Sequence, residues 1–459
     1  VVIVPVLLVI GLRGGLQQIP IQQSDAYFSK HNILNLAAVN SGWNLGQSIW
    51  DNKKNMGVNP YIYYPQEEAK KTVEAIYRTE KDTTIYILKN KRPNIVMVIL
   101  ESWSADMVRS LGGYDSITPG METIIPEGVL FENAYASGSL SDQGMAAIFS
   151  AFPAQPTVSI IFQPGKYVKL PCINTELRQA GYSTSFLFGG QLSYGNIKAY
   201  MYYNQFDRIL EGSDFADDVP TGRLGVHDEY LYERQLNELK NEKQPFFAAM
   251  FTLSSHNPYD MPMEKKDRLP FDSDEADYAN SVHYADAKLF DFLQNAKKEK
   301  WFDNTLFIIV ADHSHRSPKH WSMNQPEYRR IPMLLWGNVI KDEFKGYRNK
   351  KICSQVDIAA TLFNQLEIPA SRFEWSKNLF NPHTPGFAYF ETTDGFGWVS
   401  PSPISLPGGG AISGCQYLVY SHPMSRYYFE QTISDEEKKR LEKEGKSFLQ
   451  VMFQEYTDY

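Results

Sequence analysis

The chain has 459 residues, of which 43% are hydrophobic, and a formal net charge of −8. This globular composition and a length above one average domain predict a large α/β unit with a smaller appendage. An acidic chain without a dense run of Lys and Arg excludes a nucleic-acid partner. The three cysteines, Cys172, Cys353 and Cys415, are too widely spaced for a disulfide scaffold, so we expect buried thiols.

The N-terminus is an apolar run, VVIVPVLLVIGL, that ends before Arg13. A membrane-spanning helix needs about 20 residues, so this run is too short to cross a bilayer by itself. We interpret residues 1–12 as the end of a truncated transmembrane helix, with a core strand or a signal-peptide remnant as the alternative. Residues 13–90 lack strong apolar runs until TTIYIL and are predicted to form a linker region that packs on a catalytic domain.

A catalytic domain over residues 91–381 is predicted from a series of apolar, β-rich runs. The first is NIVMVIL at 94–100, and others follow at 182–188, 245–253, 304–311 and 331–337. Helical patterns separate these runs, and the alternation predicts a doubly wound, mostly parallel sheet. Short strand-like pieces and a charged helix from Ser434 to Phe453 then predict a small, β-rich α+β subdomain at 382–459.

Carboxylates and histidines follow three of the predicted strands. Glu101 ends the first, His256 closes the Ser-Ser-His that follows the third, and Asp312, His313 and His315 follow the fourth. Ligands gather at the carboxyl ends of strands in open α/β sheets, and these O and N donors suit Mn²⁺, Mg²⁺ or Zn²⁺. The alternatives are a solvated carboxylate at the first strand and a helix cap with a core histidine at the fourth.

A nucleophile is predicted in the segment ASGSLSDQGMAAIFSAF, which resembles a loop that runs into a helix. A serine oxygen at a helix N-terminus lies where free N–H groups and the helix dipole stabilise an alkoxide and a bound phosphate. Coordination to a divalent cation would activate such a hydroxyl for attack on phosphorus. Ser141 is the preferred candidate, with Ser137 and Ser139 as rivals and a plain N-cap serine as the alternative.

These residues together resemble the sulfatase-like and alkaline phosphatase superfamily, specifically its lipoteichoic acid synthase and phosphoglycerol transferase branch. The matching pieces are NIVMVILES, SDQG, FTLSSHNPY, NTLFIIVADHSH and SQVDIAATLFNQLEIP. The resemblance implies an α/β sandwich with one metal ion, commonly Mn²⁺, held by Glu101, Asp312, His313 and the nucleophile. It also implies that Ser141 replaces the usual Thr, that His256 faces the substrate head group, and that several membrane helices precede an extracytoplasmic catalytic domain.

The chain departs from the family pattern in three places. It lacks the C/S-x-P-x-R motif of classical sulfatases, which disfavours sulfate-ester hydrolysis. The segment FLFGGQLSYGNIKAYMYYNQFD is similar to the phosphoglycerol-binding stretch, but with Asn196 held in register Phe188, Gly195 and Ile197 replace the expected His, Trp and Arg. Ser314 stands where a Gly is usual.

The sequence thus predicts a membrane-anchored, metal-dependent phospho-group transferase that takes a phospholipid donor and a glycan or lipid alcohol acceptor through a Ser141 phospho-enzyme. His256, His315, His227 and Asn196 are the expected substrate-binding residues, with a helix cap as the alternative role of His227. A phosphoethanolamine transferase, a phosphodiesterase or sulfatase-type hydrolase, and a non-catalytic envelope module that binds glycan or lipid are the alternative functions.

Overall fold

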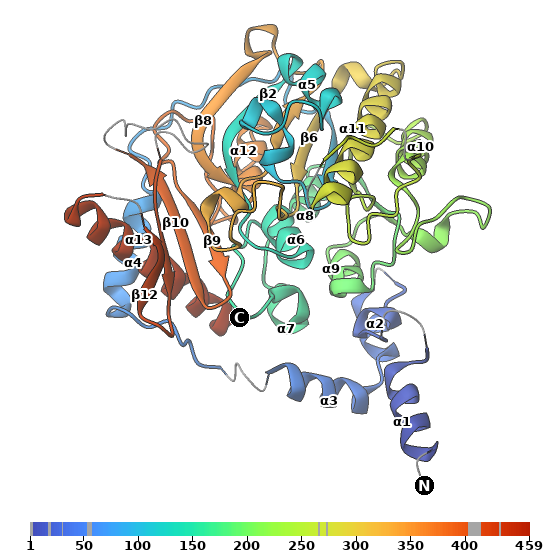
Figure 1. Cartoon of the computed structure of the whole chain (residues 1–459), viewed down its shortest axis with the longest axis horizontal. Helices are drawn as coiled ribbons and strands as arrows, with labels where there is room; N and C mark the ends of the chain where they lie inside the picture. The colour runs from blue at the N-terminus through green and yellow to red at the C-terminus, as the bar shows by residue number, and fades with distance from the viewer. Residues whose placement is uncertain are drawn as a thin grey trace.

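The structure is a computed structural model that describes residues 3–16, 20–29, 31–52, 57–264, 267–271, 274–402, 415–430 and 433–459. The first two residues of the predicted apolar segment and residues 403–414 of the predicted C-terminal subdomain lie outside these ranges. The described part contains an eight-stranded sheet and a separate four-stranded sheet (Figure 1). The large, mostly parallel sheet and the small C-terminal sheet confirm the predicted fold class.

The large sheet carries the strands that the apolar runs predicted. Its strand order is β4-β3-β5-β1-β6-β7-β2-β8, and only the pairs that include β7 are antiparallel. Every residue of the central strands β1 and β6 is buried, as expected of β-branched and apolar runs covered on both faces. The bounds are Asn94–Leu100 for β1, Val129–Tyr135 for β2, Ser183–Phe188 for β3, Arg208–Leu210 for β4, Phe246–Phe251 for β5, Thr305–Ala311 for β6, Met333–Trp336 for β7 and Tyr347–Ser354 for β8.

Helices cover both faces of this sheet. Phe149 of α6 packs against Phe247 of β5, whereas Phe292 of α11 packs against Phe307 of β6. Strand register places Phe307 level with Ala248, the residue after Phe247, so the two phenylalanines point to opposite faces. The helices of the catalytic region are α5 (Pro119–Ile124), α6 (Ser141–Ser150), α7 (Pro164–Tyr167), α8 (Ile173–Gln179), α9 (Ile197–Tyr203), α10 (Asp228–Leu239), α11 (Ala276–Ala296) and α12 (Ile358–Gln365).

The small antiparallel sheet lies against the β2–β8 edge of the large one. Its strand order is β12-β11-β10-β9, and Phe390 of β9 shares a buried apolar cluster with Tyr135 of β2 and Ile352 of β8. The last helix, α13, packs on this sheet and on α4 (Figure 1). The bounds are Ala388–Thr392 for β9, Gly395–Pro401 for β10, Cys415–Ser421 for β11, Arg426–Glu430 for β12, Gln66–Tyr77 for α4 and Asp435–Asp458 for α13.

The C-terminal helix begins where the sequence predicted and ends later. The Ser434 hydroxyl accepts a hydrogen bond from the backbone N–H of Glu437 at 3.2 Å, which is the geometry of an N-cap. The helix then continues past the predicted end at Phe453 to Asp458. Buried residues on one side of this last turn, such as Tyr456, extend its packing surface.

The N-terminal segment projects away from the two sheets (Figure 1). It contains α1 (Ile3–Arg13), α2 (Asn32–Ala38) and α3 (Ser41–Asn52), and no residue of α1 is buried. The turn after α1 is attached to the main body, because the buried Ser24 hydroxyl donates to the carbonyl of Ser193 at 3.1 Å. Among the described residues, none of the helices combines the length and the apolar character that a membrane crossing requires.

Candidate metal and nucleophile site

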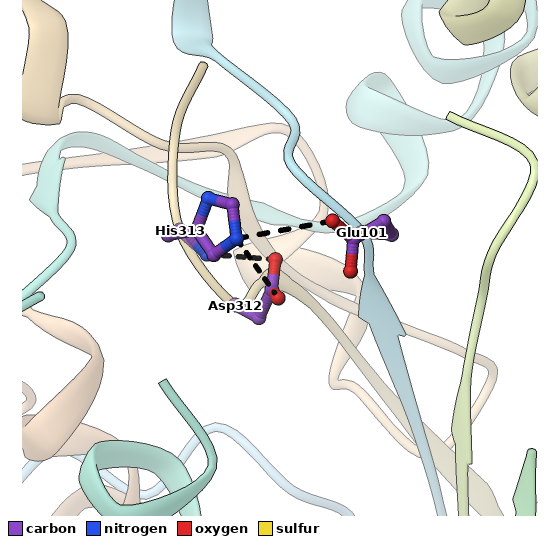
Figure 2. A group of neighbouring side chains, drawn as sticks. All are labelled: Glu101, Asp312 and His313. Carbon is purple, nitrogen blue, oxygen red and sulfur yellow. Dashed lines mark hydrogen bonds and ion pairs between the residues drawn. The ribbon is translucent and has the colours of Figure 1, made fainter. Parts of the chain in front are cut away.

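Two neighbouring strands end at a common cluster of possible metal ligands. Glu101 follows β1 directly, and Asp312 and His313 follow β6, whose last residue pairs with the last residue of β1. One ligand atom from each residue lies within 4.8 Å of the others. Figure 2 shows the three side chains gathered at one place, with His313 turned toward both carboxylates. The parallel register of β1 and β6 therefore brings together three residues that are far apart in the sequence.

The turn after β1 holds Asp312 in place. Ser102 has a positive φ of 60°, and its backbone N–H donates to Oδ1 of Asp312 at 2.8 Å. The N–H of His313 donates to the same oxygen at 2.7 Å. The other carboxylate oxygen, Oδ2, is buried without a hydrogen-bond partner among the described residues. One oxygen is thus fixed by the backbone, and the other is left to face the cluster.

The hydrogen bond of His313 sets the direction of its free nitrogen. Its Nδ1 lies 2.8 Å from the carbonyl of Ser314, so Nδ1–H donates to that carbonyl and the lone pair is on Nε2. Nε2 lies 3.5 Å from Oδ2 of Asp312 and 3.8 Å from Oε1 of Glu101. A histidine that donates one N–H to a carbonyl and turns the other nitrogen toward carboxylates has the arrangement usual for a metal ligand.

The cluster concentrates negative charge in a buried place. Burial, with the nearby charge of Glu101, raises the pKa of Asp312. Burial alone would lower the pKa of His313, but the carboxylates of Asp312 and Glu101 outweigh it, and the pKa is raised. Two buried carboxylates beside each other repel, and a bound cation relieves that repulsion.

Ser141 lies at the edge of this cluster. It is the first residue of α6, and its Oγ is 3.4 Å from Oε2 of Glu101 and 3.4 Å from Nε2 of His313. The rival hydroxyls point elsewhere: Ser137 accepts from the N–H of Ala154 at 2.8 Å, and Ser139 donates to a carboxylate of the small sheet. Of the three serines, the structure brings Ser141 to the ligand cluster.

His256 and His315 lie near each other on loops that follow β5 and β6. Each ring donates from Nδ1 to a carbonyl of the next residue, at 2.6 Å for His256 and 2.8 Å for His315. Nε2 of His315 also accepts from the hydroxyl of Tyr259 at 3.0 Å, and burial lowers the pKa of this histidine. Both ring nitrogens of His315 therefore have hydrogen-bond partners inside the protein. Among the described residues, Nε2 of His256 has none.

The other two predicted substrate residues are tied into the fold. The side chain of Asn196 is buried and donates to the carbonyl of Ile161 at 2.8 Å. His227 is 7% exposed, stands at the N-cap position of α10 without a side-chain capping bond, and packs edge-to-face on Tyr284. Burial lowers the pKa of His227. Among the described residues, no hydrogen bond joins either residue to Ser141.

Sequence reasoning missed two charged residues beside the nucleophile loop. Glu391 of β9 accepts from the hydroxyl of Ser139 at 2.6 Å, and its own N–H donates to the carbonyl of Ser137 at 2.8 Å. Nη1 of Arg329 lies 3.5 Å from the same carboxylate, and both side chains are buried. The sequence did contain a signal for Glu391, because it is a carboxylate inside the apolar run FAYFET and a buried charge requires a partner.

The donor set fits one divalent cation. It offers two carboxylates, one imidazole nitrogen with its lone pair free, and one hydroxyl, which are the O and N ligands that Mn²⁺, Mg²⁺ and Zn²⁺ accept. The buried Oδ2 of Asp312 has no hydrogen-bond partner among the described residues, and this is the observation that most directly calls for a cation.

Comparisons with known proteins agree with this fold. The family model described as Sulfatase matches residues 93–368. Lipoteichoic acid synthase 1 of Bacillus subtilis is 24% identical over 351 residues, which cover 71% of this chain and 53% of that protein. The lipoteichoic acid synthase of Staphylococcus saprophyticus is 25% identical over 244 residues, 50% of this chain and 37% of that protein. The chain thus spans about half or less of the length of these relatives.

Solved structures show the same architecture. A protein in the alkaline phosphatase superfamily from Vibrio parahaemolyticus has a TM-score of 0.69 and 24% identity, and the match covers 86% of this chain and 98% of that one. The lipoteichoic acid synthase LtaP of Listeria monocytogenes has a TM-score of 0.65 and 21% identity, with 84% and 98% covered. At these identities the likeness establishes the fold alone.

Proposed function

Because the chain belongs to the sulfatase family, we propose that it is the catalytic part of a metal-dependent phospho-group transferase of the phosphoglycerol transferase type. The observation that carries this proposal is the position of Ser141, whose hydroxyl lies 3.4 Å from both Glu101 and His313 at the start of a helix. Its relatives include lipoteichoic acid synthases, which supports phospho-group chemistry over sulfate chemistry.

Glu101, Asp312, His313 and Ser141 are the proposed ligands of a single divalent cation, with Mn²⁺ as the proposed ion. When bound, the ion supplies a positive charge that lowers the pKa of the serine hydroxyl and offsets charge on the phosphoryl oxygens. The N-terminal turn of α6 adds backbone N–H groups that face the same region.

The proposed first step is attack of Ser141 Oγ on the phosphorus of a lipid phosphodiester. An Oγ–P bond forms, the serine proton leaves to solvent, and the P–O bond to the lipid alcohol breaks. His256 donates the proton that the departing alcohol oxygen takes up. We assign this role to His256 rather than His315 because both ring nitrogens of His315 already have partners, the carbonyl of Arg316 and the hydroxyl of Tyr259.

The proposed second step returns the enzyme to its starting state. The hydroxyl of a glycan or lipid acceptor attacks phosphorus, His256 takes the acceptor proton, and the Oγ–P bond breaks as Ser141 regains a proton. If water takes the place of the acceptor, the same residues catalyse hydrolysis. The acceptor therefore decides between a transferase and a phosphodiesterase.

We further propose that α1 lies in lipid and that the catalytic domain, residues 91–381, faces the extracytoplasmic side. The support is that apolar side chains on all sides of α1 are exposed, for example Ile3 at 72% and Leu8 at 62%. A helix that is apolar all round and unburied by protein is stable in lipid rather than in water. The outer face is the side implied by the family resemblance.

The proposed function is tested by metal analysis together with turnover of a fluorescent phosphatidylglycerol. The whole chain is purified as the wild type and as Ser141→Ala, and bound metal and released diacylglycerol are measured for both. We expect about one metal ion per chain in the wild type and loss of lipid cleavage in the variant.

The other outcomes separate the alternatives. Metal without phosphatidylglycerol cleavage would redirect the search to other donors, such as phosphatidylethanolamine. Cleavage that yields only a water-derived product would identify a phosphodiesterase. A chain that binds no metal and turns over no lipid would instead be a binding module of the cell envelope.

A further inference from the structure

A cavity separate from the proposed metal site lies at the β2–β8 edge of the large sheet, with a volume of about 880 Å³. It is lined by residues of β2 and β8, by the loop at 110–112, and by the ends of β10 and β11. None of the proposed metal ligands lines it. Ligand pockets for small organic molecules usually have volumes of about 300–1,000 Å³, so the cavity is large enough for one.

The cavity is positively charged in an acidic protein. Arg330, Arg348, Lys350 and Lys351 line it, and Glu132 is the one carboxylate among the lining residues. The whole chain has a formal net charge of −8. A local excess of cations against this background is the electrostatic footprint of an anionic ligand.

Arg330 is the residue that distinguishes this cavity from an ordinary basic surface. Its side chain is 4% exposed, and its Nε is buried without a hydrogen-bond partner. Nη2 donates to the backbone carbonyl of Glu132 at 2.9 Å. Within the described residues Arg330 makes no direct ion pair, and the carboxylate of Glu327 interacts with it only electrostatically. A buried guanidinium without a direct ion pair is costly, and an anion in the cavity would supply that direct partner.

The neighbouring residue provides a comparison. Arg329 is equally buried but has the carboxylate of Glu391 at 3.5 Å. The two consecutive arginines thus face different sites, one the nucleophile loop and the other the cavity. Arg330 lacks the close carboxylate partner that Arg329 has, and the carboxylate of Glu327 acts on it only electrostatically, without a direct ion pair.

The other cationic side chains of the cavity differ in whether they already have ion-pair or hydrogen-bond partners in the protein. Arg348 is paired with Glu132, and Lys351 donates to the carbonyls of Asn381 and Thr384 at 2.7 and 2.8 Å. Lys350 is exposed, and in the part of the chain that the structure describes it makes no ion pair. Exposed lysines on an edge strand also prevent aggregation, but that role would not explain a buried arginine without a direct ion pair.

We propose that this cavity is a second anion site that binds a phosphate ester, with Arg330 and Lys350 as its principal ligands. The planar guanidinium matches the geometry of phosphate oxygens, and the compact ammonium adds a point charge. The cavity has space for the organic group of the ester, and Tyr347, which is 45% exposed, offers an apolar face at the rim. This site does not depend on the proposed role of Ser141.

The test is isothermal titration calorimetry of the whole chain at low ionic strength, with glycerol phosphate and inorganic phosphate as probes and glycerol as the neutral control. Metal is removed and the Ser141→Ala background is used throughout, so that the probes do not bind at the proposed metal site. Without metal, the buried carboxylates of that site repel an anion. The variants are Lys350→Glu and Arg330→Gln. The matched control is Lys439→Glu, which changes an exposed lysine on α13.

We expect saturable binding of one phosphate ester per chain and none of glycerol. Loss of one charged hydrogen bond is expected to weaken binding by about tenfold or more in Lys350→Glu and Arg330→Gln, and Lys439→Glu should bind normally. Thermal unfolding checks that Arg330→Gln is folded. If Arg330→Gln is unfolded, Lys350→Glu still tests the proposal, because Lys350 is exposed and its replacement should not disturb the fold.

The two probes distinguish the sources of the anion. Tighter binding of glycerol phosphate than of inorganic phosphate would indicate an ester from a polymer, glycan or lipid head group, and equal binding would indicate free phosphate. Both results support the site. No saturable binding, or equal binding by the wild type and Lys350→Glu, would overturn it.

Discussion

The predicted site residues fall into two groups, a metal side and a loop side, that are built in different ways. On the metal side, Glu101, Asp312 and His313 follow two adjacent parallel strands, and the sheet register brings them within 4.8 Å of one another. On the loop side, His256 and His315 stand on separate loops, and their side chains are held by hydrogen bonds to local carbonyls and to Tyr259. A rigid sheet edge fixes the first group, whereas loop packing fixes the second.

This difference indicates which side chains can be replaced without disturbing the fold. Side chains that sit directly after buried strands cannot move without disturbing the sheet, so the positions of Glu101, Asp312 and His313 are fixed with the fold. Side chains on loops can be replaced at lower cost, so we expect the loop side to vary more than the metal side. The expected effects of mutation follow the same division.

The largest effect is expected from Asp312→Ala on the metal side. Metal-ion charge stabilisation amounts to several kcal/mol, so turnover should fall by about a thousandfold or more. Metal content measured together with lipid turnover checks this, and Asp291→Asn, an exposed change on α11, is the control. Retained metal and turnover in Asp312→Ala would remove Asp312 from the site.

His256→Ala tests the loop side and is compared with His227→Ala. A general acid contributes about a hundredfold or more, so kcat should fall by about that factor in His256→Ala while metal content is retained. His227 is buried at the start of α10, so its removal should change turnover by less than about threefold. Equal losses in the two variants would contradict the assignment of the acid.

Glu391→Gln tests whether the small sheet supports the nucleophile loop. The charged hydrogen bond from Ser139 would become a neutral one, and kcat is expected to fall by about tenfold without loss of metal. Glu436→Gln, an exposed change in the first turn of α13, is the control. A kcat that falls equally in both variants, or in neither, would mean that the contact does not position the loop.

Gly144→Ala tests the close contact between α6 and the metal loop. A Cβ at this position would lie 2.4 Å from the backbone carbonyl of Asp312, which forces the helix and the loop apart. We expect the free energy of unfolding to fall by about 1–3 kcal/mol, with weaker metal binding. At Gly165 of α7 a Cβ meets nothing within 4 Å, so Gly165→Ala should leave both quantities nearly unchanged. Equal melting temperatures in the two variants would contradict the contact.

The sequence predicted the sheet centre and the metal side because both depend on local pattern. The continuous apolar runs at β1 and β6 end in Glu101 and Asp312, and parallel strands place such ends together. It missed the three-residue strand β4, and it missed β2 and β8 because VLFENAY and YRNKKICS interrupt apolar positions with polar or charged residues that face solvent or the basic cavity.

The contribution of the small sheet could not be predicted for a different reason. Glu391 reaches Ser139 across 252 residues of sequence, and this contact exists only because β9 packs against the β2–β8 edge. No periodicity or spacing encodes such a tertiary contact. The burial of Asn196 and the double engagement of His315 depend on tertiary neighbours in the same way.

Peptide mass spectrometry of an acid-quenched reaction tests most directly whether Ser141 carries the phospho-group. The whole chain is mixed with a phosphatidylglycerol donor and its metal in the absence of acceptor, and the peptide that contains residues 137–150 is fragmented. We expect a phosphoglycerol adduct on Ser141 and none on Ser137 or Ser139. An adduct on another residue, or lipid turnover without any adduct, would contradict it.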